Sequence, residues 1–160
     1  MATAKPEDKD TVVSIARNKR ARHDYEILDT WEAGIALQGS EVKSLRDRQA
    51  SLGDAYGVVR NGEVFLLNLH IAPYSHGGYE NHEPMRTRKL LLHRQEIRRL
   101  IGAVERKGLT LVPLELYFRR GRAKVRIGLA RGKQEHDKRH DIRERDAERE
   151  VARAFRTRNR

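Results

Sequence analysis

Hydrophobic and polar residues alternate in short runs through the middle of the chain, and turn residues separate the runs. The clearest case is DAYGVVRNGEVFLLNLHIAPY, residues 54–74, in which two β-rich runs flank Asn61-Gly62. This dipeptide readily takes the positive φ angles of a type I′ turn, so the segment predicts a β-hairpin. The next residues, 74–85, are rich in Gly, His and Asn and predict an exposed loop.

Further runs predict more strands. LTLVPLELYF and AKVRIGLA flank Arg119–Arg122, so they predict a second hairpin with Gly121 in the bend, while Pro113 indicates an edge or a bulge. RTRKLLL, residues 86–92, predicts a single strand, and residues 25–31 and 34–38 predict two adjacent strands.

Helical periodicity is clear in one place. In 93–107, apolar residues recur at i, i+3, i+4 and i+7, and Gly108 follows as a stop: Ile97, Leu100, Ile101 and Val104. SEVKSLRD, residues 40–47, predicts a shorter helical turn with Ser40 as its cap. Six or seven short strands with one well-marked helix predict a mainly β fold with helices, arranged as a small antiparallel OB-like β-barrel.

The two ends of the chain differ from this pattern. Residues 1–14 are polar and lack periodicity, so we expect them to be a disordered leader, and we expect residues 15–131 to form the OB-like domain. Residues 132–160 form a basic tail with a thin apolar stripe, in which Arg145, Arg149 and Arg153 repel one another along one helical row. We expect this tail to be disordered alone and helical on a polyanion, which would remove the repulsion.

Charge indicates the partner class. The 160 residues include 34 Lys+Arg and 23 Asp+Glu, a formal net charge of +11 that attracts nucleic acid. Basic clusters recur at 17–25, 86–89 and 119–122, although a merely soluble basic exterior is the alternative. The chain has no cysteine, no apolar run near ~20 residues and no signal peptide, so we expect a cytoplasmic protein without a membrane partner.

Signals of catalysis are weak. GLARGKQ, residues 128–134, departs from the phosphate-binding loop in both glycine spacing and final residue, and no GxSxG elbow occurs. His136 and His140 have a spacing used by zinc ligands, but the same residues suit a solvated helix or an RNA contact. We therefore expect no enzyme activity and no cofactor; a metal-dependent nuclease and a ribosome-associated structural protein remain alternatives.

Four stretches, in order, carry a family resemblance: NKRARHDY, EAGIALQGSEVKSLR, TRKLLLH and KVRIGLARGKQEHDKRHDIRER. Together they span about residues 15–150 and strongly resemble the SmpB family, the SsrA-binding proteins. The resemblance implies an OB-like barrel that binds transfer-messenger RNA (tmRNA) and delivers it to ribosomes stalled on messages without a stop codon. In this process, trans-translation, the protein fills the place of the missing anticodon arm, does no bond chemistry, and is expected to be monomeric on the RNA.

The resemblance also implies an RNA-binding surface. It includes Glu32, Leu91 and His93, and many relatives have Asn at the last of these positions. A carboxylate can accept hydrogen bonds from base amines or the ribose hydroxyl, whereas a salt bridge to neighbouring arginines is the alternative role of Glu32. Nearby phosphate contacts are expected from a basic group: Lys19, Arg20 and Arg22.

For the tail, the resemblance implies a helix inside the empty message channel of the ribosome. The residues that match the family string are Lys133, His136, Asp137, Lys138 and Arg139. Relatives often have a bulky apolar pair near the end, where this chain has Ala154-Phe155, so Phe155 is the expected apolar anchor.

Overall fold

The computed structural model describes residues 11–76, 81–132 and 149 and consists mainly of β-strands. Its helices and strands follow one another as β1 (Val12–Arg17), α1 (Ala21–Asp24), β2 (Tyr25–Ile35), α2 (Gly39–Arg46), β3 (Ala50–Ser51), β4 (Tyr56–Arg60), β5 (Glu63–Leu67), β6 (His70–Ile71), β7 (Arg88–Leu91), α3 (Arg94–Lys107), β8 (Thr110–Arg119) and β9 (Arg122–Gly132).

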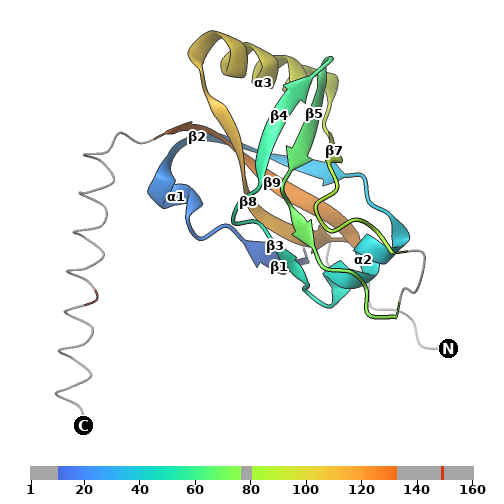
Figure 1. Ribbon diagram of the computed structural model, residues 1–160. Coiled ribbons are helices and arrows are strands. Elements are labelled where there is room, and N and C mark those ends of the chain that lie inside the picture. The colour runs from blue at the N-terminus through green and yellow to red at the C-terminus, as the bar shows by residue number, and fades with distance from the viewer. Residues whose placement is uncertain (1–10, 77–80, 133–148, 150–160) are drawn as a thin grey trace.

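The main sheet closes on itself (Figure 1). Its order is β1-β8-β4-β5-β7-β2-β9, and β9 also pairs with β8, so the strands from β8 to β9 form a ring with β1 added beside β8. Within the described residues every pair of neighbouring strands is antiparallel, including the small β3–β6 sheet. The predicted mainly β fold with a small antiparallel barrel is therefore confirmed.

One glycine allows the ring to close. The β4–β8 seam pairs Gly57 with Leu111, and a Cβ on Gly57 would lie 2.7 Å from the Leu111 Cβ. Because real Cβ atoms do not approach so closely, any side chain here would push the two strands apart.

Both predicted hairpins are confirmed. In the β4–β5 turn, Asn61 and Gly62 have φ angles of 51° and 73°. In the β8–β9 turn, Arg120 and Gly121 have φ angles of 52° and 72°. The bulge indicated by Pro113 is present, since the β8–β9 register shifts between Pro113 and Glu115.

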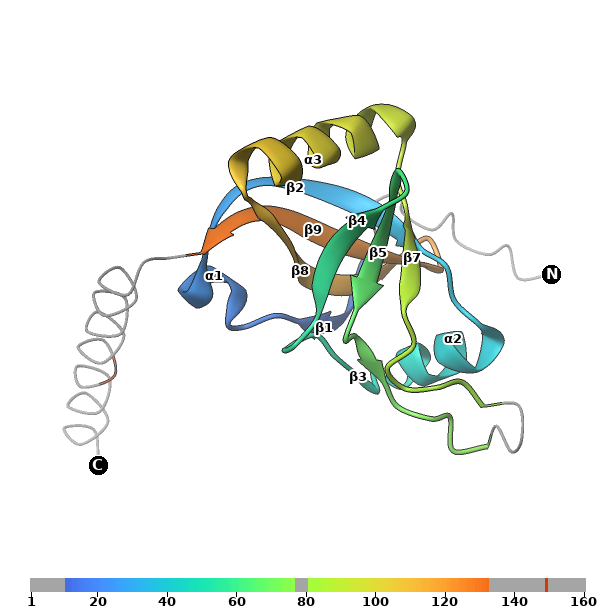
Figure 2. The same ribbon diagram turned by 45° about the horizontal axis from the view of Figure 1, so that its top comes forward.

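The long helix is also confirmed. α3 begins after His93 and ends at Gly108, whose φ of 61° is the left-handed conformation that favours glycine at a helix end. Its Leu100 is fully buried in the main core, and so is Leu45 of α2. α3 lies across one end of the barrel and α2 lies towards the other (Figures 1 and 2).

The cap of the short helix differs from the prediction. α2 begins after Gln38, whose backbone N–H donates to Glu41 Oε1 at 2.8 Å in a capping box. Ser40 is instead bonded to a distant residue, because its Oγ lies 2.9 Å from His82 Nδ1. His82 is buried and its Nε2 lies 2.8 Å from the Ile71 carbonyl oxygen, so the predicted exposed loop is wrong at this residue.

A buried ion-pair network fixes the chain around this loop. Glu41 is fully buried and accepts hydrogen bonds from Arg86 Nη2 at 2.6 Å and from Arg88 Nε. Arg88 is also fully buried and donates to the carbonyl oxygens of Leu69 and Pro84. Because each charge has several partners, the network positions α2, β7 and the connecting loop together.

Three predicted boundaries need correction. Residues 25–31 and 34–38 are not two strands, because β2 pairs with β9 from Tyr25 to Gly34 with one shift between Ile27 and Asp29. Residues 12–14 are not part of a disordered leader, because they pair with β8 in β1. Gly132 belongs to β9 and not to the tail, since it pairs with Tyr25.

Candidate nucleic-acid interface

The basic residues predicted to contact phosphate are held on a short, anchored segment. Lys19, Arg20 and Arg22 are exposed around α1, whereas Ala21 between them is buried against Val112 and Ala130. Just before them, the Asn18 backbone N–H donates to the Leu114 carbonyl at 2.9 Å, and its side-chain amide donates to the Pro113 carbonyl at 3.0 Å. Two elements of the barrel thus hold three cations towards solvent.

A polar depression lies beside this segment. It encloses about 380 Å³, and Arg20, Tyr25 and Tyr56 are among its lining residues. Tyr25 packs partly against the small core under α1, whereas Tyr56 is 40% exposed. An exposed aromatic beside an arginine suits base stacking, and sequence reasoning missed Tyr56 because it occupies an ordinary hydrophobic position of a strand.

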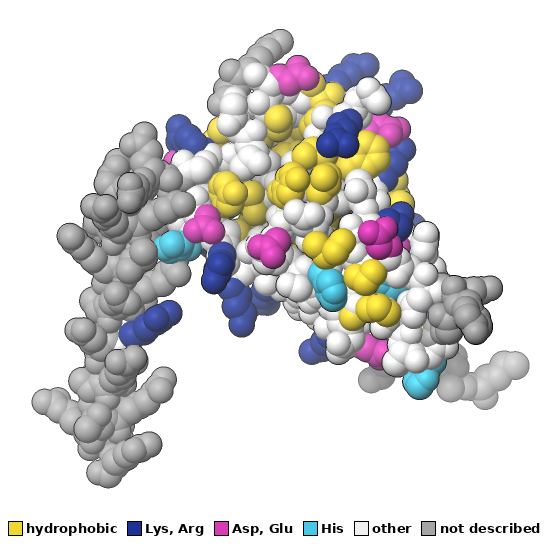
Figure 3. All heavy atoms as spheres, viewed as in Figure 1, with side chains coloured by type: hydrophobic (Ala, Val, Ile, Leu, Met, Phe, Trp, Pro, Cys, Tyr) yellow, Lys and Arg dark blue, Asp and Glu magenta, His cyan; other side chains and the backbone are white. Residues whose placement is uncertain are grey.

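Figure 3 shows how charge is distributed on one face of the molecule. Lys and Arg side chains gather beside and below α1, and others lie over the upper part of the molecule near α3, while hydrophobic side chains occupy the middle. The basic surface is therefore divided into groups at the edges of this face.

Glu32 lies at the centre of a second group of polar residues, on the outer side of the barrel. Its Oε2 accepts a 2.5 Å hydrogen bond from the Tyr117 hydroxyl. Arg119 Nε lies 3.2 Å from the same oxygen, an ion pair without hydrogen-bond geometry. Both contacts use Oε2, and about a third of the Glu32 side chain remains exposed (34%).

Tyr117 also belongs to this polar group, although it lies in a hydrophobic run of the sequence. Its side chain is fully buried, yet the guanidinium carbons of Arg119 and Arg126 lie 5.9 and 5.6 Å from its ring centroid. Burial, followed by the hydrogen bond to Glu32 and the negative charge of that residue, raises the pKa of Tyr117 to about 12. The hydroxyl therefore remains a donor to Glu32 at neutral pH.

The carboxylate also belongs to a row of alternating charge across neighbouring strands. Arg17 of β1 pairs with Glu115 of β8, Glu115 pairs with Arg126 of β9, and Arg126 pairs with Glu32 of β2. Arg17 Nε lies 3.6 Å from Glu115 Oε1. Opposite charges at directly facing positions stabilise one another and hold the arginines in an ordered row.

Leu91 lies close to Glu32 because β7 and β2 are neighbours. Leu91 pairs with Gly34, two residues beyond Glu32 on the same side of β2. A Cβ on Gly34 would lie 3.2 Å from the Leu91 Cβ, so the glycine lets Leu91 settle against the strand. Leu91 remains 52% exposed, which places an apolar side chain beside the charged group.

His93 has a structural role that the sequence did not reveal. It is the N-cap residue of α3, where its ring faces the backbone N–H of Glu96 in a capping box. In return, Glu96 Oε1 accepts a hydrogen bond of 3.3 Å from the His93 backbone N–H. Asn is among the most favourable residues at this position, which gives a physical reason for the Asn found in many relatives.

The two groups of predicted RNA-binding residues are separate. Glu32, Leu91 and His93 lie at the β2–β7 end, whereas the basic residues around α1 lie at the start of β2, roughly 20 Å away along the strand. The partners of Glu32 are Tyr117 and Arg119. A salt bridge from Glu32 to Arg20 or Arg22, the alternative raised by the sequence, is therefore wrong.

The remaining predictions of site residues fall on the tail. Lys133, His136, Asp137, Lys138, Arg139 and Phe155 lie outside the described residues, as does His140. Within the described part of the chain, no three His, Cys, Asp or Glu residues are grouped as metal ligands. None of the helices in that part is long and apolar enough to span a membrane.

Comparison with known proteins gives concordant matches. An SsrA-binding protein of Mycobacterium sp. (strain KMS) is 64% identical over 139 residues, covering 87% of this chain and 83% of that protein. The SsrA-binding protein of Thermobifida fusca (strain YX) is 58% identical over 159 residues, covering 99% of both chains.

The fold has a solved counterpart as well. A chain from the structure described as "tmRNA-SmpB: a journey to the center of the bacterial ribosome" is 56% identical, with a TM-score of 0.64 over 79% of this chain and 93% of that chain. The family model described as SmpB protein matches residues 15–157. This chain therefore belongs to the SmpB family.

Proposed function

We propose that this protein is the RNA-binding adaptor of trans-translation: it binds the tRNA-like domain of tmRNA, delivers that RNA to stalled ribosomes and substitutes for the missing anticodon arm. The observation that carries the proposal is Glu32, an outward carboxylate held among arginines on a barrel of this family. A carboxylate in a basic surface gives selectivity. It repels a phosphate placed opposite it, but it accepts a hydrogen bond from a base amine or a ribose hydroxyl at the same place.

The group around Glu32 reads the RNA, in this proposal. Tyr117 and Arg119 hold Oε2, so Oε1 is the atom that accepts a hydrogen bond from RNA. Leu91 offers an exposed apolar surface next to it, against which a sugar or base packs. His93 combines the helix cap with a contact to RNA at the ring edge.

The group around α1 supplies affinity. Lys19, Arg20 and Arg22 contact phosphates, and Tyr56 stacks on a base at the polar depression beside Arg20. Because the two groups are separate along β2, they contact different parts of the folded RNA, which fixes its orientation.

The tail is proposed to enter the empty message channel as a helix, with Lys133, His136, Asp137, Lys138 and Arg139 in the decoding region and Phe155 as an apolar anchor. The protein works by shape, in the cytoplasm, as a monomer on the RNA, without a cofactor and without bond chemistry of its own.

A gel shift with the full chain tests the proposal. Binding of tmRNA is compared with binding of an ordinary tRNA and a DNA duplex at one salt concentration, because phosphate contacts alone depend steeply on salt. We expect tmRNA to bind at least tenfold more tightly than either competitor, a difference of about 1.4 kcal/mol. Equal affinities for all three would contradict the proposal.

Two matched variants identify the residue responsible. Glu32→Gln should reduce the preference for tmRNA more than it reduces overall affinity. Glu63→Gln is the control, because Glu63 is also an ion-paired carboxylate on a barrel strand, 2.9 Å from Lys89 Nζ, and lies outside both groups. If both variants change the preference equally, Glu32 does not read the RNA.

A further inference from the structure

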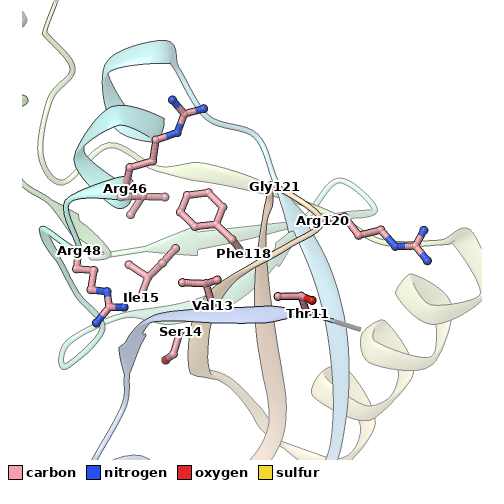
Figure 4. Close-up of a pocket in the computed structure, with 10 residues that line it drawn as sticks. Thr11, Val13, Ser14, Ile15, Arg46, Arg48, Phe118, Arg120 and Gly121 are labelled. Carbon is pink, nitrogen blue, oxygen red and sulfur yellow. The ribbon is translucent and has the colours of Figure 1, made fainter. Parts of the chain in front are cut away.

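A third feature lies away from both groups, between β1, α2 and the β8–β9 turn. It is a pocket of about 370 Å³ with an apolar floor that includes Val13, Ile15 and Phe118. Arg46, Arg48 and Arg120 line it as well, and the side chains of Arg46 and Arg120 extend outward from the rim of the floor (Figure 4). The volume is in the range of pockets that hold small organic ligands.

Arg48 stands at a position where glycine is usual. Its N–H donates to the Leu45 carbonyl at 3.0 Å, and the Gln49 N–H donates to the Ser44 carbonyl at 3.1 Å, the bond pair of a Schellman motif after α2. In that motif the residue at Arg48 is left-handed, and its φ is 56°. A residue with a Cβ is disfavoured there.

Arg120 also has a positive φ angle, in the β8–β9 hairpin turn. It precedes Gly121 in a two-residue turn with φ angles of 52° and 72°, the same conformation as Asn61-Gly62 in the other hairpin. The β4–β5 turn uses the preferred Asn at this position, whereas the β8–β9 turn uses Arg.

Arg48 and Arg120 are unusual among the non-glycine residues that have a positive φ angle. Among the residues that the structure describes, positive φ angles outside glycine occur at Arg48, Asn61, Asn68 and Arg120. Asn tolerates the left-handed conformation because its short side chain can form local hydrogen bonds, whereas Arg lacks such a side chain. Both arginines line the same pocket, and strained residues that gather at one site indicate function there.

The chemistry of the pocket points to one class of ligand. Arginines around an apolar floor suit a molecule that has a flat apolar part and anionic groups at its edges. A nucleotide has both, since the base can pack on Phe118 while the flanking phosphates pair with the arginines. An acidic peptide would satisfy the arginines but would leave the aromatic floor without a planar partner.

We propose that this pocket binds one unstacked nucleotide of single-stranded RNA, with the base on the Val13–Phe118 floor and its flanking phosphates on Arg46, Arg48 and Arg120. The inference rests on the proposed function, because an adaptor that works between tmRNA and the ribosome meets both RNAs. The pocket lies at the turn end of the β8–β9 hairpin, whereas α1 packs at the other end, so the nucleotide belongs to a region that the α1 group does not contact.

The left-handed arginines provide a test that separates folding from binding. Arg48→Gly and Arg120→Asn each introduce the residue that the local backbone favours, so each should leave the thermal midpoint unchanged or raise it. The same substitutions remove a cation from the pocket and should weaken nucleotide binding there about tenfold, as expected for a charge-assisted contact. Arg60→Asn is the control, because it removes one exposed charge next to the other hairpin turn.

The probe is a hexauridylate that carries 4-thiouridine, irradiated with the full-length chain, with the cross-linked peptides mapped and quantified. We expect cross-links in β1 or the β8–β9 hairpin that fall about tenfold in Arg48→Gly and Arg120→Asn and persist in Arg60→Asn. An abasic oligomer should compete poorly for this site, since it lacks the base. Absence of these cross-links, equal loss in all three variants, or equal competition by polyglutamate would overturn the proposal.

Two further arms identify the source of the nucleotide. Weaker gel shifts of tmRNA in the pocket variants assign it to tmRNA, whereas weaker sedimentation with ribosomes assigns it to ribosomal RNA; either result supports the pocket. No change in both arms would overturn it. If the pocket variants are neutral while Glu32→Gln still reduces the preference for tmRNA, only the pocket is wrong and the proposed function stands.

Discussion

The Tyr117 hydroxyl donates a 2.5 Å hydrogen bond to Glu32 Oε2, joining two residues that lie 85 positions apart in the sequence. Tyr117 is fully buried, and Arg119 and Arg126 lie over its ring. The Tyr117 hydroxyl thus holds the outward carboxylate of Glu32 in place, and the carboxylate in turn keeps the phenol neutral beside two guanidinium groups.

Removing only the hydroxyl should loosen Glu32. Tyr117→Phe keeps the packed ring, so we expect the free energy of unfolding to fall by about 1 kcal/mol and the preference for tmRNA over tRNA to fall several-fold. Chemical denaturation and the gel shift measure the two effects. If the folded Tyr117→Phe protein keeps the full preference for tmRNA over tRNA, Glu32 does not depend on the Tyr117 hydrogen bond for RNA recognition.

The raised pKa of Tyr117 predicts a loss of stability in alkali. The pKa is about 12 in the folded protein and about 10 in the unfolded chain, so the folded state holds the proton more tightly. This contribution is complete below pH 10 and is lost as the pH rises from 10 to 12. Denaturation curves across this window should converge for the wild-type and Tyr117→Phe proteins, and parallel curves would contradict the assignment.

The buried carboxylate of Glu41 should show the opposite pH dependence. Burial alone raises the pKa of Glu41, but hydrogen bonds from Arg86, the Gln38 backbone and Arg88 outweigh burial and hold the pKa below its usual range. Stability from this group is therefore present above the ordinary carboxyl pKa and is lost as the pH falls through the lower value of the folded state.

Glu41→Gln should consequently destabilise the protein by about 3 kcal/mol at pH 7, because it leaves the buried Arg88 and the partly exposed Arg86 without their counter-ion. Urea denaturation at several pH values measures the difference from the wild type, which should shrink in acid. Glu63→Gln, which alters an exposed pair, should change stability by less than about 1 kcal/mol. A difference for Glu41→Gln that persists at the lowest pH would contradict the assigned charge.

The cap of α3 gives a prediction about His93. His93→Asn should keep or raise the thermal midpoint and preserve tmRNA binding, because Asn is a strong N-cap and also offers a donor and an acceptor. His93→Ala should lower stability by about 1 kcal/mol and weaken binding. If His93→Asn binds tmRNA as poorly as His93→Ala does, the imidazole ring makes a contact that an amide cannot replace.

Features that depend on nearby residues could be predicted from the sequence. Asn61-Gly62 defines its hairpin by local backbone preference, and the apolar spacing that ends at Gly108 defines α3. The start of β1 could not be predicted, because Val12 and Val13 are exposed and are ordered by pairing with a strand about a hundred residues later.

The candidate site depends still more on distant residues. Ser40 has the residue type of a helix cap, but it is bonded to His82, 42 positions away, and Gln38 takes the cap. Tyr117 reads as a core residue of a strand, and only the closure of β2 and β8 around β9 brings it to Glu32. Local patterns thus identified the elements and the basic segments, whereas the partners of Glu32 required the barrel.

The most direct test of the adaptor function is peptide tagging in a purified translation system. Ribosomes are stalled on a message without a stop codon and supplied with aminoacylated tmRNA, with or without this protein, and the nascent peptide is analysed for the added tag. We expect tagged peptide only when the full chain is present and none with a chain ending at Gly132, which should stay folded and bind tmRNA. Failure of the folded full-length protein to support tagging, or equal tagging without it, would contradict the proposed function.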